Sequence, residues 1–154
     1  LYGLEALGAM RIEKGHVTGA ELDGRVTLED AGLGLMGSPK KVFIGDALRR
    51  RPELLRDDRP QLVGIFPKDR SLIFNAGSIL CAASQVSGHG DGWITAVTHS
   101  PELGHWIGIG FIAGGQSAWE GKRVISADPV REANVEVEIV SPHMVDPEGE
   151  RLHG

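Results

Sequence analysis

The sequence lacks the residues that would build a disulfide framework or a cysteine-based metal site. Cys81 is the single cysteine among 154 residues, so no disulfide can form within the chain. It lies in the apolar segment Ile79–Ala83, and this setting predicts a buried small side chain and not a nucleophile. The scarcity of cysteine also fits a reducing, cytoplasmic compartment.

Strong positive charge and long apolar runs are missing as well. The formal net charge is −5 and no basic stripe stands out, which argues against binding of nucleic acid or of an anionic membrane surface. The local excess Arg49–Arg51 is followed by acidic residues and predicts a solvated helix end. No apolar run approaches the roughly 20 residues that a membrane span requires. No signal-peptide pattern follows Leu1, and we expect the chain to be a piece of a longer protein.

The chain is expected to comprise three parts. Residues 1–15 are expected to end in a strand, because Met10–Glu13 alternates apolar and polar residues. Residues 16–56 are expected to form a glycine-rich connector with short helices, the best of them over Phe43–Leu55. Residues 57–154 are expected to form a β domain with a surface tail, so that helices are confined to the first 56 residues.

After residue 60 the pattern changes to short apolar segments separated by glycine, proline and aspartate. Their spacing predicts a mainly β fold, a small antiparallel, Greek-key-like barrel of about six strands behind an N-terminal appendage with short helices. In Val135–Ile139 apolar and acidic residues alternate strictly, which predicts one buried face and one wet face. The predicted strands are Gln61–Pro67, Ser78–Ala83, Gly92–Ser100, His105–Ile112, Arg123–Ala127 and Val135–Val140.

No motif in the sequence specifies a complete active site. Gly32–Gly37 matches the dinucleotide pattern Gly-x-Gly-x-x-Gly, but no strand-like segment precedes it and no helix-like segment follows it. A second match, Gly108–Ala113, lies within a predicted strand, where glycine permits close approach of the backbone. His99 and His105 flank one predicted loop and could face each other, but the six histidines include no short-range ligand pair such as His-Glu-x-x-His. The serines include no Gly-x-Ser-x-Gly nucleophile elbow.

The segment Gly92–Phe111 carries the most specific signal. Two strand-like runs flank a Ser-Pro-x-Leu-Gly connection, in which Pro101 suits a turn and Gly104 permits a positive φ, so the segment predicts a β-hairpin. As a string it resembles the Gly-x-Val-Thr-Ser-x-x-x-Ser-Pro-x-Leu segment in the C-terminal barrel of the glycine-cleavage aminomethyltransferase family.

Further segments extend the resemblance along the whole chain. In the same order, they are similar to the aminomethyltransferase-like region at the C-terminal end of the α subunits of heterotetrameric sarcosine oxidases. These segments are Gly3–Leu7, Met10–His16, Glu21–Gly24, Lys40–Gly45 and Asp146–His153. The resemblance implies that residues 1–15 are the end of a folate-binding domain.

The resemblance also implies a function, as the C-terminal portion of the α subunit of a folate-dependent oxidase of sarcosine (N-methylglycine). It implies that the parent enzyme uses FAD, FMN and NAD, with tetrahydrofolate as the acceptor of the one-carbon unit. Implied partners are the remainder of the α subunit and the other subunits. Within this chain it implies no catalytic residue and no metal, and it places His16 and Glu13 at the folate. Leu7 and Gly8 stand where the family has the Arg-Asp of its Ala-Arg-Asp motif, so the family's folate arginine is absent.

Two other functions stay open at this point: a stand-alone aminomethyltransferase, and a barrel that serves as a structural or interaction module. Glu13 and His16 in one cleft beside an apolar Leu7 would favour the folate-related function, whereas side chains that point apart would favour the module. We expect the isolated chain to be inactive and to bind no flavin. We also expect residues 2–12 to expose apolar surface that could drive a non-native homodimer.

Overall fold

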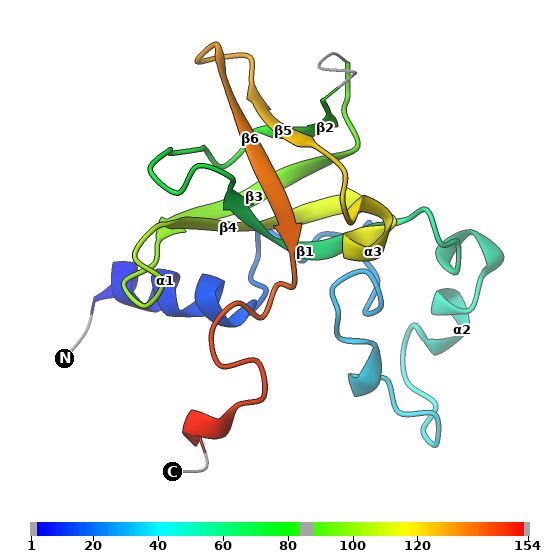
Figure 1. The fold of residues 1–154 in the computed structure, drawn as a ribbon. Coiled ribbons are helices and arrows are strands. Elements are labelled where there is room, and N and C mark those ends of the chain that lie inside the picture. Colours follow the sequence, from blue (N-terminus) through cyan, green and yellow to red (C-terminus); the bar gives the residue numbers. More distant parts are fainter. Residues whose placement is uncertain (1–2, 84–87, 153–154) are drawn as a thin grey trace.

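The computed structural model describes residues 3–83 and 88–152, and its main feature is a closed barrel of six antiparallel strands (Figure 1). The order around the barrel is β1-β4-β3-β2-β5-β6, and β1 closes it by pairing with both β4 and β6. The predicted fold class is confirmed, and the six predicted strands agree with the observed ones to within two residues at their ends. The strands are β1 (Pro60–Pro67), β2 (Ile79–Ala82), β3 (Gly92–His99), β4 (Trp106–Ala113), β5 (Val124–Asp128) and β6 (Ala133–Val140).

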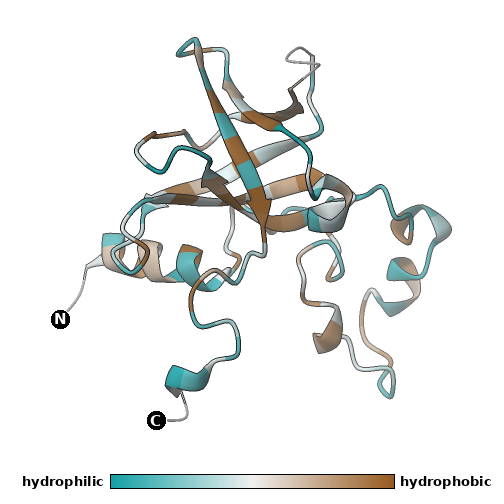
Figure 2. Ribbon diagram, viewed as in Figure 1, coloured by the Kyte–Doolittle hydropathy of each residue, from teal (hydrophilic) through white to brown (hydrophobic). Residues whose placement is uncertain are grey.

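Apolar side chains fill the barrel. Along β6, hydrophobic and hydrophilic residues alternate (Figure 2). On β6, Val135 and Val137 are buried and Glu136 between them faces outward, as the alternation predicts. Hydrogen bonds from Arg123 and Lys68 lower the pKa of Glu136 to about 2, so its charge persists on the outer surface. The core residues are Val63, Ile65, Phe74, Leu80, Ile94, Ile112, Trp119, Val124, Val135 and Val137.

Glycines let β3 and β4 approach each other closely. A Cβ atom at Gly110 would collide with the carbonyl oxygen of Trp93, and one at Gly92 would collide with the carbonyl oxygen of Phe111. The second Gly-x-Gly-x-x-Gly match therefore serves strand packing, as its place in a strand predicts.

The N-terminal segment is a helix, and the prediction of a strand at Met10–Glu13 was wrong. Helix α1 spans Leu4–Lys14, ends at Gly15 with a φ of 72°, and packs against β3 and β4. Ala9 and Ile12 are buried three residues apart, which is the spacing of one helix face. An alternation of four residues is too short to distinguish a strand from such a face.

Helical turns also occur beyond residue 56, so the expectation that helices end there was wrong. They are α3 (Gly115–Trp119) and the 3₁₀ helix η3 (Glu150–Leu152). Trp119 at the end of α3 enters the barrel core, where its indole N–H donates to the carbonyl oxygen of Ala113 at 2.8 Å. Helices of five and three residues are too short for hydrophobic periodicity to reveal them.

The connector between α1 and β1 contains only short helical pieces. The helix expected over Phe43–Leu55 is interrupted, with α2 over Asp46–Arg49 and the 3₁₀ helix η2 over Pro52–Leu54. Pro52 begins η2 because proline cannot continue an α-helix but fits a first turn. A further 3₁₀ helix, η1, covers Gly34–Met36. In the described part of the chain, no helix is long and apolar enough to cross a membrane.

A buried ion pair fastens the connector to the barrel. The carboxylate of Asp30, which is 4% exposed, accepts hydrogen bonds from Nε of Arg59 at 3.0 Å and from the backbone N–H of Thr27 at 2.9 Å. Its carbonyl oxygen accepts the N–H of Leu62 in β1 at 2.7 Å. Burial raises the pKa of Asp30, but the hydrogen bonds from Arg59 and Thr27 outweigh it, so the pKa lies below the ordinary value of 3.8.

The lowered pKa of Asp30 predicts that acid weakens the attachment of the connector to the barrel. A carboxyl group with a lower pKa in the folded state stabilises the fold above its unfolded-state pKa, and the effect is lost as pH falls through the folded-state value. We therefore expect Asp30→Asn to lower the free energy of unfolding by about 1–3 kcal/mol at pH 7. The difference from the parent chain should shrink below about pH 4 in urea titrations.

Asp58→Asn is the matched control, because the Arg56–Asp58 pair is exposed and water screens it, so its removal should leave stability almost unchanged. An Asp30→Asn deficit that stays constant from pH 7 down to pH 2 would contradict the assignment.

Candidate functional site

Helix α1 packs on the loop end of the β3–β4 hairpin through a second apolar cluster. Ile12 of α1 contacts Ile107 and Ile109 of β4, and all three are at most 4% exposed. Partly buried side chains complete this cluster: Phe66, Ala96, Leu103 and Met144. The hairpin predicted from the sequence therefore holds the N-terminal helix through apolar contacts.

A buried hydrogen bond joins the same two elements. The Ser100 side chain is fully buried, and its hydroxyl donates to Oε1 of Glu13 at 2.5 Å. The same hydroxyl accepts the backbone N–H of Leu103 at 3.0 Å, which closes the turn that Pro101 and Gly104 shape. The Ser-Pro-x-Leu-Gly motif thus has a structural role, because the Ser100 hydroxyl accepts a hydrogen bond within the loop and donates one to helix α1.

The C-terminal tail covers the other side of α1. The backbone N–H groups of Met144 and Val145 both donate to the carbonyl oxygen of Glu13 at 3.0 Å. Nζ of Lys14 lies 3.2 Å from Oδ2 of Asp146. Desolvation raises the pKa of Asp146. Hydrogen bonds from Lys14 and from backbone amides outweigh this effect, so the pKa lies below its ordinary value. The tail is thereby fixed to the last turn of α1.

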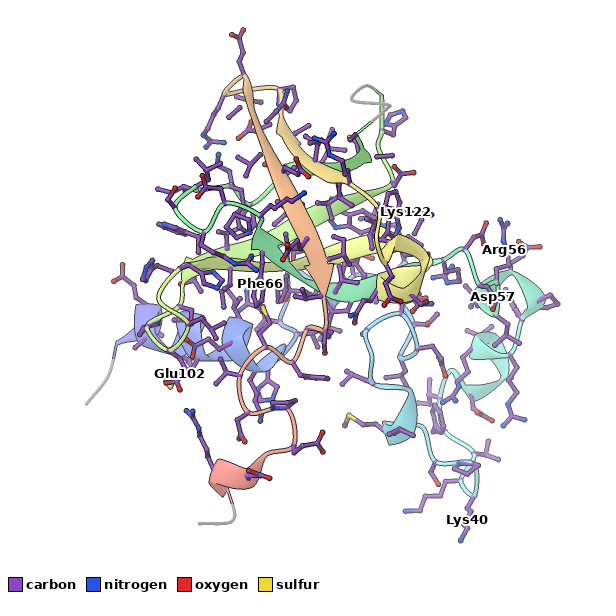
Figure 3. The ribbon with its side chains drawn as sticks, in the orientation of Figure 1. Lys40, Arg56, Asp57, Phe66, Glu102 and Lys122 are labelled. Carbon is purple, nitrogen blue, oxygen red and sulfur yellow. The ribbon has the colours of Figure 1, made fainter. Side chains whose placement is uncertain are left out.

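A second ion pair joins the tail to the hairpin loop. Nη2 of Arg151 lies 2.5 Å from Oε1 of Glu102, and this hydrogen bond lowers the pKa of Glu102. Glu102 projects from the loop beside α1 (Figure 3). The loop, the helix and the tail therefore form one continuous structure.

An open cleft of about 390 Å³ lies between α1 and the tail. It brings together the two site residues implied by the resemblance, Glu13 and His16, with Leu7 beside them. Leu7 is 48% exposed and Met10 is 46% exposed, so the cleft offers apolar surface to a ligand. The lining residues are Leu7, Met10, Arg11, Glu13, Lys14, His16, Val145, Asp146 and Arg151.

The two implied site residues are not equivalent in this cleft. Glu13 is 9% exposed, and one of its carboxylate oxygens already accepts the Ser100 hydroxyl. His16 is exposed. Glu13 therefore has mainly a structural role, and His16 is the side chain of the pair that is available to a ligand.

Arg11 and Glu21 hold the loop that carries His16, and sequence reasoning assigned neither a role. Glu21 is 1% exposed, and Oε2 of Glu21 accepts the N–H of Thr18 at 2.7 Å and Nη1 of Arg11 at 3.2 Å. Arg11 also donates to the carbonyl oxygen of His16 at 3.2 Å. Oε1 of Glu21 is buried without a hydrogen-bond partner in the described part of the chain. Both residues lie in segments that carry the resemblance, but their pairing across ten positions has no local sequence signal.

The other candidate motifs do not assemble into sites. His99 packs edge-on against Trp106 and His105 against Phe66, and no cluster of three or more potential metal ligands occurs among residues 3–83 and 88–152. The Gly32–Gly37 segment contains η1 and follows a turn, so it lacks the strand and α-helix that a dinucleotide fingerprint requires. Cys81 is buried, as predicted, and burial raises the pKa of its thiol.

The cleft is lined by apolar residues and by charged residues of both signs, among them Lys14 and Asp146. Leu7, Met10 and Val145 supply the apolar surface, and Arg11 and His16 supply hydrogen-bond donors. Such a combination suits a flat ring system that carries carboxylate groups, because the rings cover apolar surface and cations pair with the acids.

Comparison with known proteins agrees with this fold. The family model for the glycine cleavage T-protein C-terminal barrel domain matches residues 61–146, and the chain belongs to this family. The glycine cleavage system aminomethyltransferase T from Bartonella henselae superposes with a TM-score of 0.69 at 22% identity, over 92% of this chain and 38% of that protein. The family expected from the Gly92–Phe111 segment is confirmed.

Curated relatives narrow the similarity within this family. The sarcosine oxidase subunit alpha of Rhizobium meliloti (strain 1021) is 36% identical over 155 residues, and that of Corynebacterium sp. (strain U-96) is 35% identical over 160 residues. Both matches cover 99% of this chain but only 16% of the relative. The chain therefore spans about one sixth of the length of these relatives.

The Glu13–Ser100 hydrogen bond gives a testable coupling. Ser100→Ala should lower the free energy of unfolding by about 1–3 kcal/mol, because a buried carboxylate oxygen loses its hydroxyl donor and keeps only the longer bond from the N–H of Glu102 at 3.4 Å. Glu13→Gln should cost less after Ser100→Ala than before it, with a coupling energy of about 1 kcal/mol or more in a double-mutant cycle from urea unfolding.

Ser117→Ala is the control, since Ser117 lies exposed in α3 and its loss should change stability by at most about 0.5 kcal/mol. Strictly additive effects of the Glu13 and Ser100 substitutions would contradict the proposed link.

Proposed function

We propose that this chain is the C-terminal portion of the α subunit of a folate-dependent sarcosine oxidase. It contributes to the half of the enzyme that transfers the one-carbon unit to tetrahydrofolate, and it is not catalytic alone. The observation that carries the proposal is the cleft that gathers Leu7, Glu13 and His16 in a chain matched over 99% of its length by sarcosine oxidase α subunits.

In this proposal, oxidation of sarcosine and transfer of the one-carbon unit to folate take place in different parts of the enzyme. Oxidation of the N-methyl group removes two electrons from its carbon, and a flavin supplies the chemistry that accepts them. The described residues of this chain offer no strand–turn–helix site for a dinucleotide. We therefore assign FAD, FMN and NAD to the remainder of the α subunit and to the other subunits. The contribution of this chain is binding and orientation of the folate.

Each cleft residue has a role in this proposal. Leu7 and Met10 provide the surface on which the folate rings lie, and the His16 ring stacks or donates a hydrogen bond there. Arg11 and Glu21 hold the His16 loop in place. Because Leu7 replaces the family's arginine, the basic groups that line the cleft, Lys14 and Arg151 among them, are the anchors for the folate carboxylates.

The same proposal assigns a cellular location. The parent enzyme is cytoplasmic, in line with a single cysteine that is buried and whose thiol has a raised pKa. Its partners are the other parts of the oxidase.

The test uses the complete enzyme carrying His16→Ala. Loss of one hydrogen-bonding or stacking contact costs about 1–1.4 kcal/mol, so the tetrahydrofolate concentration for half-saturation should rise roughly five- to tenfold. Sarcosine-dependent peroxide formation without folate should be unchanged, because flavin reduction takes place elsewhere. Assays of methylenetetrahydrofolate, formaldehyde and peroxide separate these quantities.

His89→Ala is the matched control, because His89 is exposed and lies between β2 and β3, outside the cleft. A His16→Ala enzyme with unchanged folate saturation, or with peroxide formation lowered in the absence of folate, would overturn the assignment.

A further inference from the structure

Three basic side chains that line the cleft beside α1 are already paired with carboxylates of this chain. The pairs are Arg11 with Glu21, Lys14 with Asp146, and Arg151 with Glu102. A ligand that carries carboxylate groups must therefore add to one of these pairs or replace its internal carboxylate. Which pair can exchange its partner depends on where the released carboxylate would lie.

The Arg11–Glu21 pair cannot exchange its partner. The Glu21 side chain is 0% exposed, so removal of the guanidinium would leave a buried carboxylate without its cation. Arg11 also donates to the carbonyl oxygen of His16, and this bond holds the loop beside the cleft. Arg11 therefore stays with Glu21.

The Lys14–Asp146 pair is fixed by a second set of contacts. The Asp146 side chain is 13% exposed, and the backbone N–H groups of Glu150 and Arg151 act on the same carboxylate and help to lower its pKa. Displacement of Asp146 would release the tail, which forms one side of the cleft. Lys14 therefore keeps Asp146 and offers a ligand only its remaining N–H donors.

The Arg151–Glu102 pair differs from the other two because both of its side chains are largely in water. Arg151 is 64% exposed and Glu102 is 46% exposed, so a released Glu102 carboxylate would pass into solvent at little cost. The backbone N–H of Glu102 donates to Oε1 of Glu13 at 3.4 Å, and this contact can remain when the side chain moves.

The geometry of Arg151 also leaves room for a second carboxylate. Among residues 3–83 and 88–152, only Nη2 of its guanidinium group donates to another side chain, and it does so to one oxygen of Glu102. Arg151 lines the cleft, whereas Glu102 reaches it from the hairpin loop outside (Figure 3). A guanidinium group binds a carboxylate best through two parallel N–H bonds, which a ligand that enters the cleft could form.

We propose that Arg151 binds a carboxylate group of the folate ligand, and that Glu102 occupies Arg151 until the ligand displaces it. This inference rests on the proposed function, which supplies a ligand with carboxylates, and it adds an internal competitor for that ligand. Glu102 lowers the affinity for folate, because only the fraction of molecules in which the Arg151–Glu102 pair is open can bind the ligand carboxylate.

The test compares single and double variants of the complete enzyme. Glu102→Gln should lower the tetrahydrofolate concentration for half-saturation roughly two- to fivefold, because the competing carboxylate is gone. Arg151→Gln should raise it roughly tenfold, because a charge-assisted hydrogen bond to the ligand is lost. The double variant should match Arg151→Gln alone, because Glu102 then has no cation to occupy.

Glu138→Gln is the matched control. Glu138 is 45% exposed and pairs with Arg70 at 2.9 Å on the outside of β6, so its loss removes the same charge without touching the cleft. Folate saturation should be unchanged in this variant. A tetrahydropterin that lacks the glutamate moiety is the second control: as a competitor of tetrahydrofolate it should inhibit Arg151→Gln and the parent enzyme equally, because it has no carboxylate for Arg151.

A higher half-saturation concentration in Glu102→Gln overturns the exchange, because the pair would then be needed to hold the tail. A gain in Glu102→Gln that persists in the double variant also overturns it, since that gain would come from long-range charge. Unchanged saturation in both single variants, together with an effect of His16→Ala, overturns the exchange and leaves the proposed function standing. No response in any of the three variants overturns both.

Discussion

The orientation of helix α1 on the barrel depends on one buried hydrogen bond, from the hydroxyl of Ser100 to the carboxylate of Glu13. The barrel itself is closed and needs no partner for its strand edges. Helix α1 has only one face with apolar contacts, and its cleft-facing side chains stay half exposed. The bond fixes the rotation of α1 on the hairpin, and the backbone carbonyl of the same Glu13 then receives the C-terminal tail. Glu13 thus helps to position both helix α1 and the tail, which are the two sides of the cleft.

The barrel could be predicted from the sequence because its signals are local. In Val135–Ile139 the alternation of apolar and acidic residues gave both the strand and its buried face, and the turn residues around Ser100–Gly104 gave the hairpin. Helix α1 was not predicted, because Met10–Glu13 alternates like a strand while the burial that matters joins Ala9 to Ile12. The tertiary contact between α1 and β4 favours the helix over a strand here, and a local sequence pattern gives no information about that contact.

The candidate site, like the fold, could be predicted only in part from the sequence. His16 and Glu13 were reached through resemblance, and physical reasoning on the sequence could not have separated their roles. The separation comes from Ser100, which lies 87 positions from Glu13 and occupies its carboxylate. Arg11 and Glu21 were missed because ion pairs between distant positions carry no periodicity.

The chain is a closed barrel with a cleft between helix α1 and the C-terminal tail. The cleft beside α1 suits a small ligand with rings and carboxylates. The central claim is that the cleft forms one wall of a folate site. Photolabelling of the complete enzyme with a diazirine derivative of tetrahydrofolate, followed by peptide mapping, tests this claim most directly. The account predicts labelled peptides from residues 4–16 or 143–151 that disappear when excess tetrahydrofolate is added. Folate-protected labelling confined to other parts of the enzyme would contradict it.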